Sequence, residues 1–329
     1  MDKEKFQYME SKEDTMPLTR RNQASREIER KLNNQGELIW RITQTIQQDG
    51  VIQVLEGVFL ARASSLLGLN HHLMTPSFCM IVQGSKEFLL GDSRYYYDPN
   101  HYLITALELP SISQILEATP ERPYISLRIN LDSSLVESVI EEVGLSSQLN
   151  NTDIRAMDVG ILDVNLQDAV LRLVRLIDNP TEAPFLAKLI KKEIVYRLLM
   201  GQQGARLRYL AAQGTCTPHI AKVVDRIRQN FDQPMNFEDL AYELGMSVSG
   251  LYHSFKAVTA LSPLQFQKQL RLQEARRLML SEGWDAASAA YRVGYHDPAY
   301  FNRVYKSVFG LPPIRHIKQL REGVSSEAV

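Results

Sequence analysis

The sequence predicts an α+β protein, with antiparallel strands and flanking helices in its N-terminal part and only helices in its C-terminal part. Three observations predict this division. A helical unit is written twice between Asn236 and Pro313, short runs of β-forming residues separated by turn residues fill positions 51–132, and a helical apolar period returns between positions 158 and 208. Many short strands close together in sequence favour an antiparallel sandwich or a small barrel.

The repeated unit has the pattern of a helix-turn-helix. Each copy opens at an N-cap residue, Asn236 or Asp285, and continues with apolar residues at i, i+3, i+4 and i+7. Each first helix ends at a glycine, Gly245 or Gly294, which tolerates the left-handed conformation of a tight turn. A second helix follows, and both copies close with a short connection into proline. In this motif the second helix typically enters the DNA major groove.

A further helix is expected between the two copies. Pro263 suits a first helical turn, and the apolar residues Leu272, Ala275, Leu278 and Met279 then form one stripe. A helix of about 18 residues spans roughly 27 Å, and successive major-groove openings on one DNA face lie roughly 34 Å apart. The sequence therefore predicts that one chain reads two neighbouring groove segments.

These motifs resemble the DNA-binding domain of the AraC/XylS family of bacterial transcription regulators. The segments that carry the resemblance are 241–247 (Ala-Tyr-Glu-Leu-Gly-Met-Ser), 270–278, 290–295, 301–303 and 310–313. The resemblance implies binding to double-stranded promoter DNA, activation more often than repression, and contact with RNA polymerase. No cofactor is implied.

The N-terminal part resembles the N-terminal domain of one subgroup of the same family. The segments that carry it include 82–86 (Val-Gln-Gly-Ser-Lys), 102–105, 122–124, 192–199 and 201–204. This resemblance implies a cupin-like β-barrel that senses a small effector or mediates dimerisation, so we expect an effector-responsive homodimer.

The expected organisation has five parts. They are a disordered lead-in (1–19), a sensing and dimerisation domain (20–205), a linker (206–217), a DNA-binding domain (218–320) and a tail (321–329).

Helical spacing separates the inward and outward residues of the two expected recognition helices. The residues expected to face the core are Val248, Leu251 and Phe255 in the first helix and Phe301, Val304, Tyr305 and Val308 in the second. The residues expected to face DNA are Ser249, Gly250, His253 and Lys256 in the first helix and Ala299, Tyr300, Asn302, Arg303 and Lys306 in the second. For each of these, the alternative is a solvated helix face.

Residue chemistry assigns roles to three of the outward residues. An arginine can bind guanine through two hydrogen bonds, so Arg303 is the candidate for base contact, while Lys256 and Lys306 are candidate phosphate anchors. The subgroup tends to have Arg where this chain has His253, and Ser and Gln where it has Ala299 and Tyr300. We therefore expect a different operator sequence or a greater dependence on DNA shape.

The composition limits the class of protein. Of 329 residues, 44% are hydrophobic and 23% charged, and no apolar run is long enough to span a membrane. The polar N-terminus is not that of a secretory signal, and two cysteines cannot form a disulfide framework, so we expect a cytoplasmic protein. The net charge of −1 combines a mildly basic segment, 221–320, with 13 Lys and Arg against 9 Asp and Glu, and an acidic remainder.

The N-terminal part offers few candidates for chemistry. His71 and His72 are adjacent, so in a strand they point to opposite faces, and we expect no metal site. Cys79 fits an inert core thiol, Cys216 fits an exposed thiol, and residues 95–97, all Tyr, are candidates for either a ligand pocket or the core. We expect no catalytic residues and no enzyme. A metal-dependent cupin enzyme and a ligand-free interaction domain stay open as alternatives for this part.

Overall fold

The N-terminal part is built from two antiparallel sheets. The computed structural model describes residues 18–326 apart from 67, 146–153 and 212–218. Within these ranges the strands are β1 (Gly50–Leu55), β2 (Val58–Ala63), β3 (Asn70–Met74), β4 (Ser77–Gln83), β5 (Ser85–Leu90), β6 (Ser93–Tyr97), β7 (His101–Thr105), β8 (Leu109–Glu117), β9 (Tyr124–Asn130) and β10 (Met157–Ile161). One sheet has the order β1-β2-β9-β4-β7-β10 and the other the order β3-β8-β5-β6.

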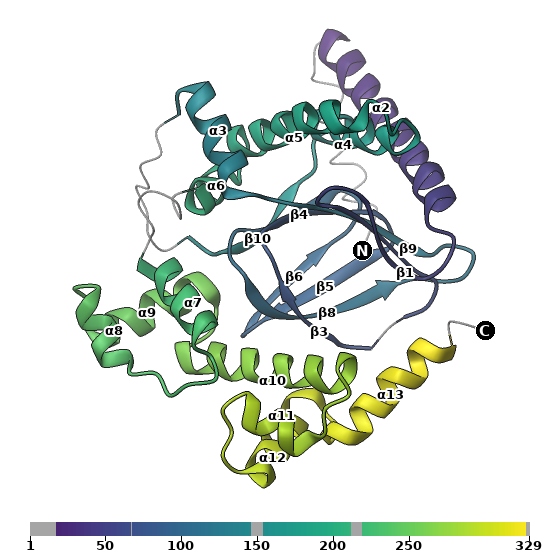
Figure 1. Ribbon diagram of the computed structural model, residues 1–329. Helices are drawn as coiled ribbons and strands as arrows, with labels where there is room; N and C mark the ends of the chain where they lie inside the picture. Colours follow the sequence, from purple (N-terminus) through teal and green to yellow (C-terminus); the bar gives the residue numbers. More distant parts are fainter. Residues whose placement is uncertain (1–17, 67, 146–153, 212–218, 327–329) are drawn as a thin grey trace, which may run out of the picture.

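Helices cover both outer faces of this pair of sheets. Their bounds are α2 (Leu18–Thr45), α3 (Ser133–Val143), α4 (Val164–Arg175), the 3₁₀ turn η1 (Leu176–Asp178), α5 (Ala183–Met200), α6 (Gly204–Ala211), α7 (His219–Gln229), α8 (Phe237–Glu243), α9 (Val248–Thr259), α10 (Pro263–Ser281), α11 (Ala286–Arg292), α12 (Pro298–Phe309) and α13 (Pro313–Ser326). Helices α2 to α6 lie over the six-stranded sheet, and the four-stranded sheet lies between that sheet and α10 (Figure 1).

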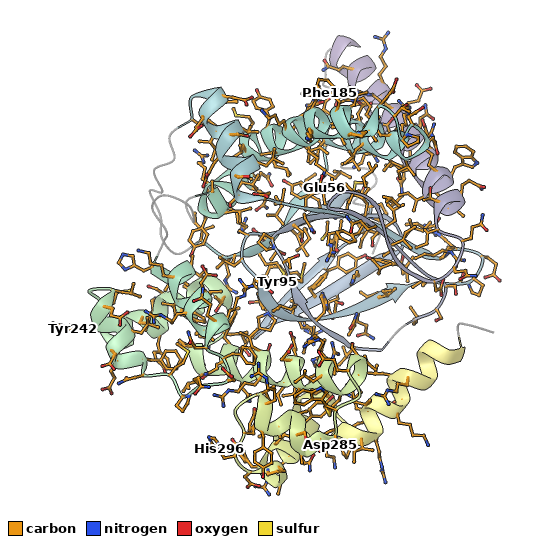
Figure 2. The ribbon with its side chains drawn as sticks, viewed as in Figure 1. Glu56, Tyr95, Phe185, Tyr242, Asp285 and His296 are labelled. Carbon is orange, nitrogen blue, oxygen red and sulfur yellow. The ribbon has the colours of Figure 1, made fainter. Side chains whose placement is uncertain are left out.

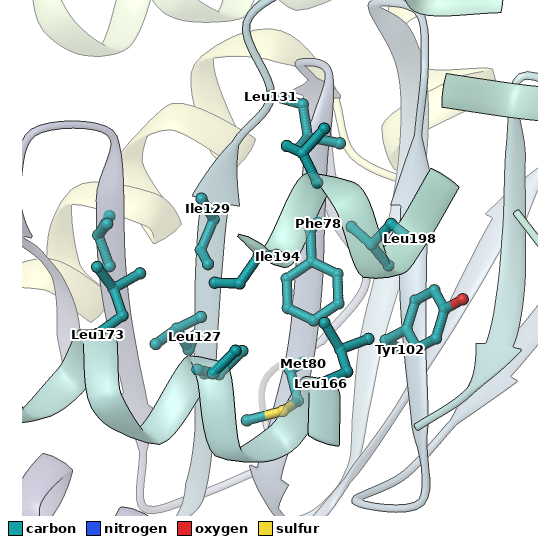
Figure 3. Close-up of a cluster of buried hydrophobic side chains, with 14 of the residues drawn as sticks. Phe78, Met80, Tyr102, Leu127, Ile129, Leu131, Leu166, Leu173, Ile194 and Leu198 are labelled. Carbon is teal, nitrogen blue, oxygen red and sulfur yellow. The ribbon is translucent and has the colours of Figure 1, made fainter. Parts of the chain in front are cut away.

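The α+β fold is confirmed, and the strands form two stacked sheets where one closed barrel was expected. Strand alternation explains the stacking. On β2 and β9 the residues that face the helices, such as Val58, Leu60 and Leu127, are at most 1% exposed. They join Phe78 and Leu166 in a core between the sheet and its helices (Figure 3).

Helix α2 differs from its sequence expectation. The helical pattern of the sequence from Asn22 to Gln48 predicts an interruption near positions 33–36, yet α2 continues without a break from Leu18 to Thr45. Asn34 is buried and Gln35 Nε2 donates to the Val82 carbonyl at 3.2 Å, so tertiary contacts outweigh the weak helix propensity of this segment. The spacing of Leu38, Ile42 and Ile46 predicts one apolar face, and this face is confirmed because Leu38 and Ile42 are fully buried.

Three expectations about connecting segments change. Residues 157–161, expected at the edge of a helical region, form strand β10, which pairs with β7. Residues 206–211 of the expected linker belong to helix α6, whose Leu207 and Leu210 lie in the helix-covered core; residues 212–218 lie outside the described residues. The expected tail from 321 continues helix α13 as far as Ser326. The expected lead-in lies outside the described residues except for positions 18 and 19, which begin α2.

Candidate nucleic-acid interface

Helices α8 and α9 form the first helix-turn-helix. The Asn236 side chain accepts hydrogen bonds from the Glu238 and Asp239 amides, and the Ser247 hydroxyl accepts one from the Gly250 amide, so both helices begin at a capped residue. Gly245 between them has φ +66°, the left-handed conformation expected of the turn. The two caps fix where α9 begins and therefore which of its residues face outward.

Helices α11 and α12 repeat this arrangement. Asp285 and Asp297 cap their N-termini, and Pro298 occupies the first turn of α12. Gly294 has φ +85°, and a Cβ atom there would lie 2.0 Å from the Asp232 carbonyl oxygen. This turn therefore requires glycine for two independent reasons.

The residues expected to face DNA lie at the surface of α9 and α12. All are exposed except Gly250, which is half-buried beside Ser247. Of the residues expected to face the core, Leu251, Phe255, Phe301 and Tyr305 are fully buried, and Val304 and Val308 are half-buried. The expectation for Val248 is wrong: it is 40% exposed, because it occupies the first turn of α9, beyond the core.

Arg303 presents an unneutralised cation on α12. Its guanidinium lies 5.8 Å from the centre of the Tyr300 ring, and no carboxylate pairs with it among the described residues. Lys306, one turn further on, is also without an ion pair within the described ranges. Cations left without internal partners on an exposed helix can bind phosphate oxygens or guanine edges.

Lys256, the corresponding lysine of α9, has a different environment. Its Nζ lies 3.8 Å from a carboxylate oxygen of Asp92, in the turn between β5 and β6. Both side chains are well exposed, so this pair contributes little stability and can be exchanged for a phosphate contact.

Helix α10 separates the two copies by a fixed length. It has 19 residues, which correspond to about 28 Å. Ser262 and Gln265 form a reciprocal capping box, and Pro263 occupies the first turn. A helix stabilised in this way holds the two recognition helices at a set separation.

The other side of α10 binds the sensing part of the chain through strand β3. Gln273 Nε2 donates to the His72 carbonyl at 3.2 Å, and Arg276 donates to the His71 carbonyl. The His71 ring lies 4.7 Å from the ring of Phe309, the last residue of α12. The α9 end is held as well, because the Ala156 amide donates to the Val258 carbonyl at 2.9 Å. The helical part therefore contacts the sheets through α10, the end of α9 and the end of α12.

A cavity of about 500 Å³ lies at this junction. It is lined by side chains from both parts of the chain, including His72, Glu108, Arg228, Gln273 and Arg276. Arg228 pairs with Glu108, whose carboxyl pKa is nevertheless raised by burial. The mixture of charges is typical of a polar interface between two domains.

The two adjacent histidines face opposite sides of β3, as expected. His71 points toward α12, while the His72 ring lies 5.6 Å from Phe88 on the inner face of the four-stranded sheet. Burial lowers the pKa of each to about 4, and nearby cations act in the same direction. Among the described residues, no three His, Cys, Asp or Glu side chains converge as metal ligands do.

The remaining candidates of the N-terminal part differ in burial. Cys79 is buried, and burial raises its thiol pKa, whereas Cys216 lies outside the described residues. Tyr97 is 2% exposed and packs between the sheets, while Tyr96 on the opposite face is 50% exposed. Tyr95 is half-buried at the inner side of the sheet (Figure 2).

Sequence reasoning missed two tyrosines that the repeat places at equivalent positions. Tyr242 of α8 is 88% exposed and Tyr291 of α11 is 57% exposed, and Figure 2 shows Tyr242 at the outer edge of the molecule. They are 49 residues apart, which is the period of the repeat. The sequence could have revealed them, because in both copies of the repeat a tyrosine directly follows the buried alanine, Ala241 or Ala290.

Comparison with known families gives two matches. A model described as the AraC-type transcriptional regulator N-terminus matches residues 54–206, and a model described as a helix-turn-helix domain matches residues 240–319. Together they cover most of the chain and correspond to the two sheets with their helices and to helices α8 to α13.

Curated relatives match smaller shares of their own length. The transcriptional activator RhaS of Escherichia coli (strain SE11) is 29% identical over 97 residues, which are 30% of this chain and 34% of RhaS. The transcriptional regulator ArgR of Pseudomonas aeruginosa is 24% identical over 160 residues, 48% of this chain and 49% of ArgR. The chain thus spans between a third and a half of the length of these relatives.

Solved structures of ToxT from Vibrio cholerae share the fold. An apo ToxT variant superimposes with a TM-score of 0.53 at 12% identity, covering 79% of this chain and 97% of ToxT. ToxT bound to an unsaturated fatty acid gives the same TM-score and covers 83% and 95%. At this identity the likeness concerns the fold alone. Within the described ranges, no helix combines the length and apolar character needed to cross a bilayer.

Proposed function

Because this chain belongs to the AraC/XylS family of transcription regulators, we propose that it binds promoter DNA sequence-specifically and controls transcription there. The observation that carries the proposal is the pair of helix-turn-helix units. Each presents an exposed recognition helix, and one 19-residue helix separates them. Helices α9 and α12 would enter two successive major-groove segments.

Arg303 would read a base edge, and Lys306 would bind a phosphate. Ser249, Gly250, His253 and Lys256 would line the first groove, and Ala299, Tyr300 and Asn302 would complete the contacts in the second. With one arginine among these residues, much of the affinity would come from phosphate contacts and DNA shape.

The N-terminal part would sense a small effector and pass its presence to the DNA-binding part. The domain models support this division, because one matches residues 54–206 and the other residues 240–319. ToxT has been crystallised with an unsaturated fatty acid and with an arylbutenoic acid, so a protein of this fold accepts small organic ligands. Contact with RNA polymerase, activation of transcription and a cytoplasmic location complete the proposal.

Dimerisation would use the outer face of α5. Phe185, Leu189, Tyr196 and Met200 recur along one side of this helix and are 70%, 50%, 42% and 56% exposed. Phe185 points away from the body of the molecule (Figure 2). Only Lys192, which pairs with Glu142, interrupts this apolar face, and an exposed apolar face of a helix is typical of a helix–helix interface.

The substitution Arg303→Ala tests the proposal. The full chain first selects its preferred DNA from a random pool. The variant should bind this DNA with a binding free energy weakened by about 1–3 kcal/mol and with relaxed preference at one base position. Arg122→Ala, which removes an exposed arginine from the sensing part, is the control for lost charge and should bind as wild type. Unchanged affinity and base preference in Arg303→Ala would remove this role from α12.

A further inference from the structure

Along β2 and β9 the inner face of the six-stranded sheet is packed less tightly than its helix-covered face. On β2 and β9, Val58, Leu60 and Leu127 face the helices and are at most 1% exposed. Their neighbours Phe59 and Ser126, which face the other sheet, remain half-buried. The sheets therefore leave accessible surface between them beside these two strands, although the rest of the space between them is filled by a buried core.

Two cations point into this space from opposite sheets. Lys86 of β5 lies with its Nζ 4.9 Å from the Phe88 ring and 5.8 Å from the Tyr124 ring of the other sheet. Arg128 of β9 stacks its guanidinium 4.3 Å from the Phe59 ring. Lys86 keeps some accessible surface although protein atoms surround it, as is expected of a group lining an internal space.

Neither cation has an anionic partner. Arg128 Nε is buried without a hydrogen bond, and no hydrogen bond or ion pair reaches Lys86 or Arg128 within the described ranges. The charged groups that influence Lys86 are the Cys79 thiol and Arg128 itself, with no carboxylate among the described residues. Burial lowers the pKa of Lys86 to about 8, and the Arg128 charge acts in the same direction.

Such an arrangement is costly for the fold taken alone. A buried charge without a partner is destabilising, and two like charges facing each other increase the cost. Ionisable groups that are perturbed by burial and by a specific neighbouring charge cluster at functional sites, where a ligand can supply the missing charge. The remaining walls are aromatic or apolar, with Phe59, Phe88 and Tyr124 around the two cations.

We propose that the space between the sheets binds a small organic carboxylate, whose anionic group is held by Lys86 and Arg128 and whose apolar body packs on the surrounding aromatic rings. This inference rests on the proposed function, because it names the chemistry of the effector. Lysine and arginine donors to one carboxylate form strong charge-assisted hydrogen bonds. His72 of β3 connects the site to the DNA-binding part: its ring packs on Phe88, and its carbonyl accepts a hydrogen bond from Gln273 of α10.

Matched pairs of carboxylates and alcohols test the charge requirement. Benzoate, cinnamate and octanoate are compared with benzyl alcohol, cinnamyl alcohol and octanol by thermal shift and calorimetry on the full chain. At least one carboxylate should raise the melting temperature while its alcohol does not. Lys86→Met and Arg128→Met should each weaken its binding roughly 10- to 100-fold, the loss of one hydrogen bond to a charged group. Lys188→Met, on the exposed surface of α5, should retain it.

Three results would overturn the assignment. The first is that every carboxylate binds wild type and the two variants equally well. The second is that the alcohols stabilise wild type as much as the carboxylates do. The third is that inorganic phosphate binds as well as the carboxylates. The variants without any probe give an independent readout, because each removes an uncompensated charge. Their melting temperatures should equal or exceed that of wild type, and lower values would show that the cations support the fold.

DNA binding is measured on the same preparations. If Lys86→Met binds selected DNA like wild type while no probe response is seen in wild type, the carboxylate site alone fails. If wild type binds no DNA, the proposed function fails.

Discussion

At the scale of single residues, the histidines of β3 make the junction between the two parts of the chain sensitive to pH. The charged groups that face His71 are Arg276 of α10 and His316 of α13, and those near His72 are Lys86, Arg128 and Arg276. All are cationic or become so in acid. A proton on either imidazole is therefore opposed by both burial and charge.

We predict that the protein loses stability as the pH falls from about 6.5 toward 4. The folded pKa values of about 4 lie below the 6.5 of an unperturbed histidine, so the unfolded chain binds more protons in this window. The free energy of unfolding should drop by up to about 2 kcal/mol per histidine between pH 7 and 5. Thermal melts as a function of pH measure this.

Substitution separates these histidines from other acid-sensitive groups. His71→Gln and His72→Gln should each reduce the pH dependence, whereas His253→Gln, on the exposed face of α9, should leave it unchanged. A pH profile that is identical in all four proteins would assign the acid sensitivity elsewhere.

At the scale of elements, the helix boundaries of the DNA-binding part follow closely from local chemistry. The N-caps Asn236, Asp285 and Asp297 and the turn glycines could be predicted because capping and left-handed turns depend on neighbouring residues alone. Strand β10 could not, because Asp158 and Gly160 are disfavoured in strands and residues 157–161 become a strand by pairing with β7.

Two glycines give opposite predictions when replaced by alanine. Gly294→Ala should destabilise the protein by at least about 2 kcal/mol, because φ is +85° and the new methyl would meet the Asp232 carbonyl. Gly36→Ala should stabilise it by about 0.5–1 kcal/mol, because Gly36 lies inside α2 with nothing within 4 Å of its Cβ position. Denaturant titrations of both variants compare the two effects. Stabilisation by Gly294→Ala would contradict the role of this turn.

At the scale of the whole molecule, the two helix-turn-helix units differ in how they pack against the sheets. The buried residues of α7, α8 and α9 form one cluster with residues between the sheets, such as Leu103 and Tyr124, whereas those of α11 and α12 form a separate cluster around Leu272 and Tyr305. The first helix-turn-helix is thus held by the sensing part more firmly than the second. The sequence alone could not predict this unequal packing, nor that Lys86 and Arg128 face the same space between the sheets. Both features depend on residues that are distant in the chain.

The exposed stripe of α5 predicts the effect of one charge on assembly. Leu189→Glu places a carboxylate at its centre and should raise the dimer dissociation constant at least about tenfold, since burying an unpaired charge is costly. Lys188→Glu, beside the stripe on the same helix, should not. Sedimentation equilibrium measures both. Equal association of the two variants would exclude this face as the interface.

The central claim is that α9 and α12 of one chain bind successive groove segments at a separation set by α10. The most direct test inserts about 5 base pairs, half a helical turn, between the two contact segments of a selected operator and measures binding of the full chain. The second segment then faces the opposite side of the duplex, which a rigid 19-residue helix cannot follow. We predict that affinity falls by at least about tenfold, because one recognition helix loses its groove. Unchanged affinity would contradict the claim.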